Sequence, residues 1–223
     1  MSLDKIKYPR SYHLHYSEKL SSKDDRSHID DAHFIDKNVT CSIKMDGENT
    51  TCSNEYSHAR SLNSGIDSED RRWVESMRTS KIVGNIPDSY RICGENLFYK
   101  HTCAYDNLDS LFNVFSIWDN KKCLSWKETV KISNELELST VHIFYEGIYD
   151  KGLILEAFNN FLESTTDDVE GFVVRNSGEF MYEDFKFNLS KFVRNTFVVP
   201  PQHWRHSKKT INKLSNNKNP WEI

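Results

Sequence analysis

The sequence predicts an α+β fold built mainly on antiparallel sheets. Short runs rich in β-branched and aromatic residues recur along the chain, and in the first of them Val39, Cys41 and Ile43 alternate with Thr40 and Ser42. Longer segments with helical periodicity are interspersed among these runs, an order typical of α+β proteins. The predicted strands are 38–44, 50–60, 90–99, 111–118, 141–147, 169–176 and 189–194, and the predicted helices are 68–81, 125–135 and 150–163.

The early elements carry clear boundary signals. The first strand runs into Asp46-Gly47, a pair that favours a hairpin turn before the strand at 50–60. The helix at 68–81 begins after Ser68 with two acidic residues, which suit the positive N-terminal end of a helix. We therefore expect a strand, a tight turn, a second strand and a helix in that order.

The later elements are also bounded by the sequence. Two apolar, aromatic-rich runs, 90–99 and 111–118, read as strands. The helix at 150–163 starts at Asp150 and places its apolar residues on one stripe. That stripe consists of Leu153, Ile154, Ala157, Phe158 and Phe161.

Length and composition indicate one folded domain of 223 residues, 37% hydrophobic and 13% aromatic. No apolar run is long enough to span a bilayer, and the first residues, MSLDKIKYPR, lack the apolar region of a signal peptide. We expect a cytoplasmic or nuclear monomer that does not bind membranes.

The cysteine pattern favours buried free thiols. The cysteines number 5, an odd count, with no CxxC pair, and the 9 histidines show no zinc-ligand spacing. The sequence therefore predicts neither disulfides nor a structural zinc.

The formal charge of -4 gives no global signal for nucleic acid, but the C-terminal end is basic. Its bases are Lys186, Lys191, Arg194, Arg205, Lys208, Lys209, Lys213 and Lys218, against Glu222. This end is either a polyanion-binding surface or, for residues 207–220, a solvated tail. We divide the chain into a domain at 1–206 and a basic tail at 207–223.

Four charged residues stand inside strand-like apolar segments: Lys44, Glu95, Glu170 and Lys191. A charge in a packed strand is costly unless it is paired or binds a metal. Any one of them could be an edge-strand charge facing water, and Lys44 alone could be a surface lysine at a strand end. Together they predict convergence on one site.

The motifs KMDGENTT, HARSL, CGENL and EGFVVR, in this order, resemble those of the covalent nucleotidyltransferases, which include ATP-dependent RNA and DNA ligases and mRNA capping enzymes. The chain is most similar to the small phage-type nick-sealing RNA ligases, from about Tyr8 to about Trp204. The resemblance implies a nucleotidyltransferase domain, an ATP-grasp-like ligase adenylation fold, with flanking helices. It also implies an enzyme of RNA repair that joins RNA 3′-OH and 5′-phosphate ends.

The resemblance assigns the adenylation chemistry to particular residues. Lys44 would attack the α-phosphate of ATP, giving a lysyl-adenylate, and an attacking amine must be neutral, so we expect its pKa to be lowered. Glu170 would hold Mg²⁺ or Mn²⁺, and Asp46 would orient the site and the water bound to that metal. Lys191 would neutralise the α-phosphate, and Glu95 would bind the ribose hydroxyls.

Further residues are implied on the same ground. Asn49 resembles the residue that assists the sealing step, and Arg60 matches a position that contacts AMP or the RNA end. Phe115 or Trp118 would stack on adenine, and the sequence does not choose between them.

The chain departs from the family pattern in three places. Ile43 precedes the nucleophile where relatives often carry an acid. Leu189 fills the first position of the final Lys-x-Lys motif; Lys186 could compensate, or the site could use Lys191 with Arg194 alone. The block FVRNTFVVPPQHWRH also resembles a family ending, which would place His203 and Trp204 near the site or give them a structural role.

DNA ligases and capping enzymes carry an OB-fold domain after the last motif, and the 32 residues after Lys191 are too few for that barrel. We therefore expect either a compact RNA ligase, which we favour, or a fragment. The alternatives are a capping-type guanylyltransferase, a DNA ligase core, or an RNA-end-binding module whose catalysis has decayed.

Overall fold

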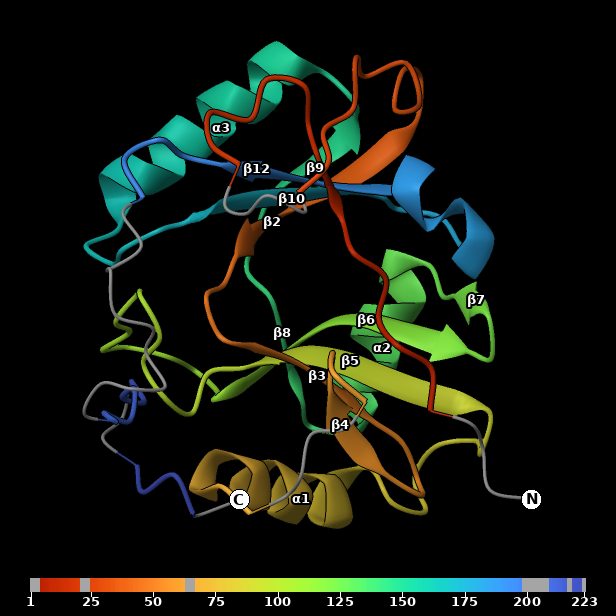
Figure 1. Ribbon diagram of the computed structural model, residues 1–223, viewed down its shortest axis with the longest axis vertical. Helices are drawn as coiled ribbons and strands as arrows, with labels where there is room; N and C mark the ends of the chain where they lie inside the picture. The colour runs from red at the N-terminus through yellow and green to blue at the C-terminus, as the bar shows by residue number, and fades with distance from the viewer. Residues whose placement is uncertain (1–4, 21–24, 63–66, 198–208, 216–217, 222–223) are drawn as a thin grey trace.

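A computed structural model describes residues 5–20, 25–62, 67–197, 209–215 and 218–221 of the chain. Two sheets face each other, with α3 on the outer face of one and α1 below the other (Figure 1). The fold is α+β with mainly antiparallel pairing, as predicted. In the described residues, no helix is both long enough and apolar enough to cross a membrane.

Three of the four predicted charged residues lie in the upper sheet or directly before one of its strands: Lys44, Glu170 and Lys191. Its order is β1 (Tyr12–His13), β12 (Leu189–Val193), β10 (Gly171–Asn176), β2 (Asn38–Lys44) and β9 (Ile143–Ile148). Its outer face packs on α3 (Lys151–Ser164), where Ile154 and Phe158 join Phe172 and Phe192 in one apolar core. Asp150 caps α3 by accepting the N–H of Leu153, as its position predicts. The predicted stripe is wrong at Leu153, whose side chain is exposed.

The lower sheet carries Glu95, the fourth of the predicted charged residues. Its order is β11 (Phe180–Met181), β7 (Lys122–Cys123), β6 (Phe112–Asp119), β5 (Tyr90–Asn96), β3 (Glu48–Cys52) and β4 (Ser57–Ala59), with β8 (Ser139–Thr140) beside β6. Trp73, Val74 and Met77 of α1 (Glu69–Lys81) belong to the main apolar core of this half. The helix α2 (Trp126–Glu135) packs beside β6 and β8, and the 3₁₀ helix η1 (Tyr182–Phe187) leads into β12.

Asp46-Gly47 does not make the predicted hairpin turn. The strand β2 pairs with β9 and β10, whereas β3 pairs with β4 and β5, so the chain crosses from one sheet to the other at this pair. Gly47 is required there, because a Cβ would collide with the carbonyl oxygen of Asn96. The crossing places the residues on either side of it on facing sheets.

Other differences from the predicted elements are local. The predicted strand 50–60 is two strands, β3 and β4, joined by a turn at 53–56, and Arg78 donates to the carbonyls of Ser53 and Asn54 there. Four strands of two residues each escaped prediction because runs that short show no periodicity. All five cysteines are buried and free, as predicted.

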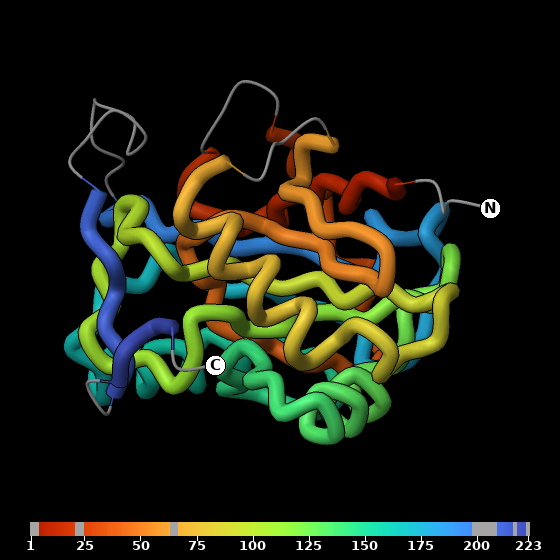
Figure 2. Tube along the Cα trace, turned by 90° about the horizontal axis from the view of Figure 1, so that it is seen from below, coloured from red at the N-terminus to blue at the C-terminus, as the bar shows by residue number. Residues whose placement is uncertain are grey.

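Described parts of the predicted basic tail pack against the lower half of the molecule. Asn212 is buried and donates to the carbonyl of Leu97 at 2.8 Å, and Trp73 donates to the carbonyl of Pro220 at 2.5 Å. Figure 2 shows this segment running alongside the rest of the chain. These residues are therefore not a free solvated tail, and the division at residue 206 stays a prediction.

Candidate active site

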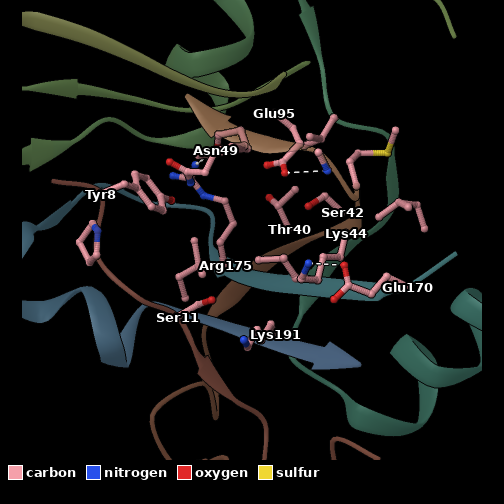
Figure 3. Close-up of a pocket in the computed structure, with 18 of the residues that line it drawn as sticks. Tyr8, Ser11, Thr40, Ser42, Lys44, Asn49, Glu95, Glu170, Arg175 and Lys191 are labelled. Atoms are coloured by element: carbon pink, nitrogen blue, oxygen red, sulfur yellow. Dashed lines mark hydrogen bonds and ion pairs between the residues drawn. The ribbon is translucent and has the colours of Figure 1, made fainter. Parts of the chain in front are cut away.

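A cavity of about 570 Å³ lies between the two sheets. Seven of the sequence-predicted site residues line it: Lys44, Asn49, Arg60, Glu95, Phe115, Glu170 and Lys191. Figure 3 shows Lys44, Glu170 and Lys191 on one side and Glu95 and Asn49 on the other. The four charges embedded in strand-like segments thus converge on one cavity, as the sequence predicts.

Strand register arranges the upper wall in rows, because alternate residues of a strand face the same side. Ser42, Val173 and Lys191 form one row across β2, β10 and β12. Lys44 and Gly171 form the next row, where a side chain on Gly171 would collide with the carbonyl of Phe192. The wall is therefore polar at β2 and β12 and leaves room beside Lys44.

Lys44 forms an ion pair with Glu170, which lies beside it on the same side of the cavity. Burial alone would lower the pKa of the Lys44 ammonium, but the carboxylates of Glu170 and Glu95 outweigh burial and raise that pKa above its ordinary value. The predicted lowering of the Lys44 pKa is thus wrong for the site as it stands. The sequence could not reveal this, because the opposing carboxylates come from strands far along the chain.

Glu95 approaches from the lower sheet. Its Oε1 accepts the N–H of Gly47 at 3.0 Å. Burial raises the pKa of the Glu95 carboxyl to about 8, although the nearby Lys44 works in the opposite direction. At neutral pH this side chain is therefore mainly protonated and can donate as well as accept a hydrogen bond.

Glu95→Gln is expected to stabilise the fold at neutral pH. The unfolded carboxyl ionises near 4.5 and the folded one near 8, so the unfolded state loses its proton first and wild-type stability falls as pH rises through that window. The variant lacks this loss, and its free energy of unfolding should exceed that of wild type by roughly 1–3 kcal/mol at pH 8. Urea denaturation at pH 5 and pH 8 measures the difference; Glu156→Gln, at an exposed position on α3, is the control and should show none. An equal effect at both pH values would contradict the prediction.

Lys191 reaches the cavity from β12 and pairs with a residue that the sequence did not single out. Its Nζ lies 3.0 Å from Oδ1 of Asp25. Burial lowers the pKa of Lys191, and Asp25 acts against that lowering. Lys191 therefore depends on a partner from the N-terminal segment.

The structure decides between the two candidate aromatic residues. Phe115 of β6 and Val173 of β10 both line the cavity, where a flat ring could contact them. Trp118 is fully buried and packs against Tyr8 and Phe185. Trp118 belongs to the core and does not line the cavity.

Asn49 and Arg60 lie on the lower side of the cavity. The Oδ1 atom of Asn49 is buried and has no hydrogen-bond partner within the described residues. Arg60 donates its backbone N–H to the carbonyl of Asn49 at 2.9 Å, which holds the two residues together. A buried acceptor without a partner is uncommon, and a bound ligand that donates to it would satisfy it.

Besides Trp118, three predicted residues do not line the cavity. Asp46 accepts the N–H groups of Thr102 and Cys103 at 2.7 and 2.8 Å and so holds a neighbouring loop. Lys186 is exposed, with its ammonium over the ring of Phe187, and stays a predicted substitute for the lysine missing at Leu189. Arg194 donates to the carbonyl of Val169 at 3.3 Å. His203 and Trp204 lie outside the described residues.

Sequence reasoning missed several residues of the cavity wall: Tyr8, Arg10, Asp25, Thr40, Ser42 and Arg175. Arg175 is buried and donates to the carbonyls of Phe115 and Leu124 at 3.2 and 2.9 Å, so it joins the two sheets at one end of the cavity. It stands in the quoted motif EGFVVR, and its charge inside a strand was the signal that could have identified it.

The carboxylates suit a divalent cation held jointly with a substrate. Within the described ranges no three His, Cys, Asp or Glu side chains cluster closely enough to hold a metal by themselves. Mg²⁺ commonly uses one or two carboxylates together with water and substrate phosphates. Glu170, beside Lys44 in the cavity, fits that role.

Comparisons with known proteins show the family and the fold of this chain. A family model described as RNA ligase matches residues 37–193. No curated protein sequence matches the chain. Among solved structures, a protein of Aquifex aeolicus classed as an ATP-dependent DNA ligase superposes with a TM-score of 0.54 at 15% identity, over 84% of this chain and 49% of its own.

Two RNA ligase structures share the same fold. An archaeal ATP-dependent RNA ligase has a TM-score of 0.52 at 13% identity, over 84% of this chain and 48% of its own. A Naegleria gruberi RNA ligase variant with ATP and Mn has a TM-score of 0.50 at 14% identity, over 75% of this chain and 52% of its own. This chain therefore spans about half the length of each of these proteins, and the likeness shows the ligase nucleotidyltransferase fold.

Proposed function

The chain belongs to the RNA ligase family, and from this premise we propose that it is an ATP-dependent RNA ligase that joins 3′-OH and 5′-phosphate ends through lysyl-AMP and RNA-adenylate intermediates. The observation that carries the proposal is the meeting of Lys44, Glu95, Glu170 and Lys191 in one cavity. A lysine nucleophile, a cation for phosphate and carboxylates for ribose and metal are the groups that lysine adenylation needs.

In the first step, the Nζ of Lys44 attacks the α-phosphorus of ATP, and the bond from that phosphorus to the oxygen of pyrophosphate breaks. The ammonium must first lose a proton, and Glu170, its ion-pair partner, lies in position to accept it. Lys191 neutralises charge that develops on the α-phosphate oxygens. A divalent cation bound at Glu170 would offset the carboxylate charge and stabilise the phosphate oxygens.

The remaining groups orient the nucleotide. Phe115 and Val173 would hold the base between the sheets, and Glu95 would hydrogen-bond the ribose hydroxyls. Relatives often carry an acidic residue at the position of Ile43, where it would contact the base. In this chain, Thr40 and Ser42 of β2 line the cavity and are the candidates for contact with the edge of the base. The expected preference for adenine over guanine rests on the family resemblance.

In the later steps, AMP passes to an RNA 5′-phosphate, and a 3′-hydroxyl then attacks that phosphorus and releases AMP. Asn49, with its unpartnered buried oxygen, and Arg60 are the candidates to position the RNA ends. Phosphate contacts should dominate affinity, so RNA binding should weaken as salt rises.

Incubation of the protein with α-³²P-labelled ATP or GTP and Mg²⁺ or Mn²⁺, followed by a denaturing gel, tests the proposal. We expect label from ATP on the polypeptide, and joining of RNA 3′-OH and 5′-phosphate ends in a nicked duplex, a tRNA-like break or a single strand. Label from GTP would instead indicate a capping-type enzyme. Sealing of DNA but not RNA would indicate a DNA ligase core. Absence of label from both nucleotides, in folded protein free of prior adenylation, would contradict catalysis and favour an RNA-end-binding module.

A further inference from the structure

The N-terminal segment contributes to the cavity although it precedes residues 37–193, the part that the family model matches. The strand β1 runs parallel to β12 and places His13 beside Lys191. The N–H of His13 donates to the carbonyl of Arg26 at 2.7 Å, and the N–H of His28 donates to the carbonyl of His13 at 2.9 Å. These bonds join Arg26 and His28, which follow Asp25, to His13 at the edge of the upper sheet.

A chain of buried polar contacts joins this segment to β12 at both ends. Oδ1 of Asp25 lies 3.0 Å from Nζ of Lys191, and Oδ2 of Asp25 lies 3.5 Å from Nε2 of His13. Nδ1 of His13 lies 2.8 Å from Oγ of Ser17, which accepts the N–H of Val193 at 2.9 Å. The side chains of Asp25 and His13 are 5% and 0% exposed, so water does not compete strongly for these contacts.

The contacts also indicate the tautomer of His13. Because Oγ of Ser17 accepts from Val193, its own proton can go to Nδ1 of His13, which is closer than the carbonyl of Lys19 at 3.4 Å. In that arrangement the ring proton lies on Nε2, 3.5 Å from Oδ2 of Asp25, a contact longer than a hydrogen bond. Burial, followed by Lys191, lowers the pKa of His13 to about 4, so the ring is neutral and faces the carboxylate without adding charge.

Lys191 needs such support because it is the only lysine of the final motif at the cavity. Leu189 occupies the first motif position and is buried, and Lys186 is exposed and absent from the cavity wall. A long lysine side chain loses considerable conformational freedom when it is held in one place. An anionic partner fixed by its own neighbours offsets that loss.

We propose that Asp25, buried beside His13, is a positioning residue that holds the ammonium of Lys191 where the α-phosphate of the nucleotide binds. The role rests on the proposed function of the cavity. It assigns the segment before residue 37 to the active site.

The test compares lysine adenylation in Asp25→Asn, Asp25→Glu, Lys191→Ala and Asp25→Asn/Lys191→Ala. Asp25→Asn should lower the maximal rate of labelling from ATP by at least about 10-fold with a smaller change in the ATP concentration for half-maximal rate, and Asp25→Glu should restore part of it. If Asp25 acts through Lys191, the double variant should be no slower than Lys191→Ala. Additive losses, or faster labelling by Asp25→Asn because the carboxylate merely fills the phosphate position, would overturn the proposal.

Asp31→Asn is a matched control. Asp31 contacts His15 at 2.8 Å on the same segment, with a side chain that is also largely buried, but it does not line the cavity. Asp31→Asn should label at the wild-type rate, and near-ultraviolet circular dichroism checks that each variant is folded. A loss equal to that of Asp25→Asn would assign the effect to the segment's structure and overturn the positioning role.

A second readout does not depend on activity. The NMR titration of ¹³C-dimethylated lysines, with the Lys191 signal assigned by its absence in Lys191→Arg, reports the pKa of Lys191, which Asp25, His13, Lys44 and Glu170 all influence. Asp25→Asn should lower that pKa and Asp31→Asn should leave it unchanged. An unchanged pKa in Asp25→Asn would overturn the proposal whatever the labelling shows, whereas unlabelled wild-type protein with the expected NMR shift would remove the proposed function alone.

Discussion

Replacement of Lys44 with alanine is expected to abolish transfer of AMP from ATP to the polypeptide, with a loss of at least about 10³-fold in the rate of labelling. The side chain supplies the nitrogen that forms the P–N bond, and no other lysine lines the cavity in the described residues except Lys191, which is held by Asp25. A gel with α-³²P-labelled ATP measures the loss. The label on wild-type protein should be released by acid, as expected for a P–N bond.

Two further variants make this result specific. Lys44→Arg keeps a positive charge beside Glu170 and so preserves the fold, but it should also remain unlabelled. Lys122→Ala is the matched control, since Lys122 pairs with Glu179 at 3.2 Å on the surface and should label normally. Substantial label on folded Lys44→Arg would show that the nucleophile is another residue.

Glu170→Gln is expected to slow lysine adenylation by about 10²- to 10³-fold. The carboxylate is the partner of the Lys44 ammonium and the candidate to hold the divalent cation, so its loss removes both the proton acceptor and an anionic ligand. Label incorporation measured over a range of Mg²⁺ or Mn²⁺ concentrations should show a weaker dependence on the metal in the variant.

Glu183→Gln is the control for this variant. Glu183 pairs with Lys121 at 3.2 Å on the surface, so its replacement removes a glutamate–lysine pair without changing the cavity. It should match wild type at every metal concentration. If Glu170→Gln labels as fast as Glu183→Gln, Glu170 has no part in the reaction and the candidate metal site is wrong.

The sequence predicted the elements well because their signals are local. Alternation in residues 38–44 and the start signals at Ser68 and Asp150 depend on neighbours along the chain, and the structure places β2, α1 and α3 within a residue or two of those predictions. The predicted hairpin turn at Asp46-Gly47 was wrong, because the sequence of a two-residue connection is the same whether the next strand joins the same sheet or the facing one.

The residues of the site also divide into those that the local sequence identified and those that only the folded structure revealed. The cost of burying a charge is a property of each residue and its strand, so Lys44, Glu95, Glu170 and Lys191 were identified without a structure. The roles of Phe115 and Trp118 could not be separated, since both are aromatic residues of one strand and only packing places one at the cavity and the other in the core. Asp25 and His13 gave no signal, because an aspartate and a histidine in a polar segment are ordinary surface residues until a parallel strand pairing sets them beside Lys191.

By itself, then, the sequence determined the fold class, the longer strands, the three α-helices, the family, and the charged residues that are costly to bury in a strand. The tertiary structure decided which of these charges face one another. That decision changes their chemistry, since the pKa of Lys44 depends on the carboxylates of Glu95 in β5 and Glu170 just before β10, and the pKa of Lys191 depends on burial and on Asp25 of the N-terminal segment. Electrostatic energy depends on distance through space, and only the folded chain sets those distances.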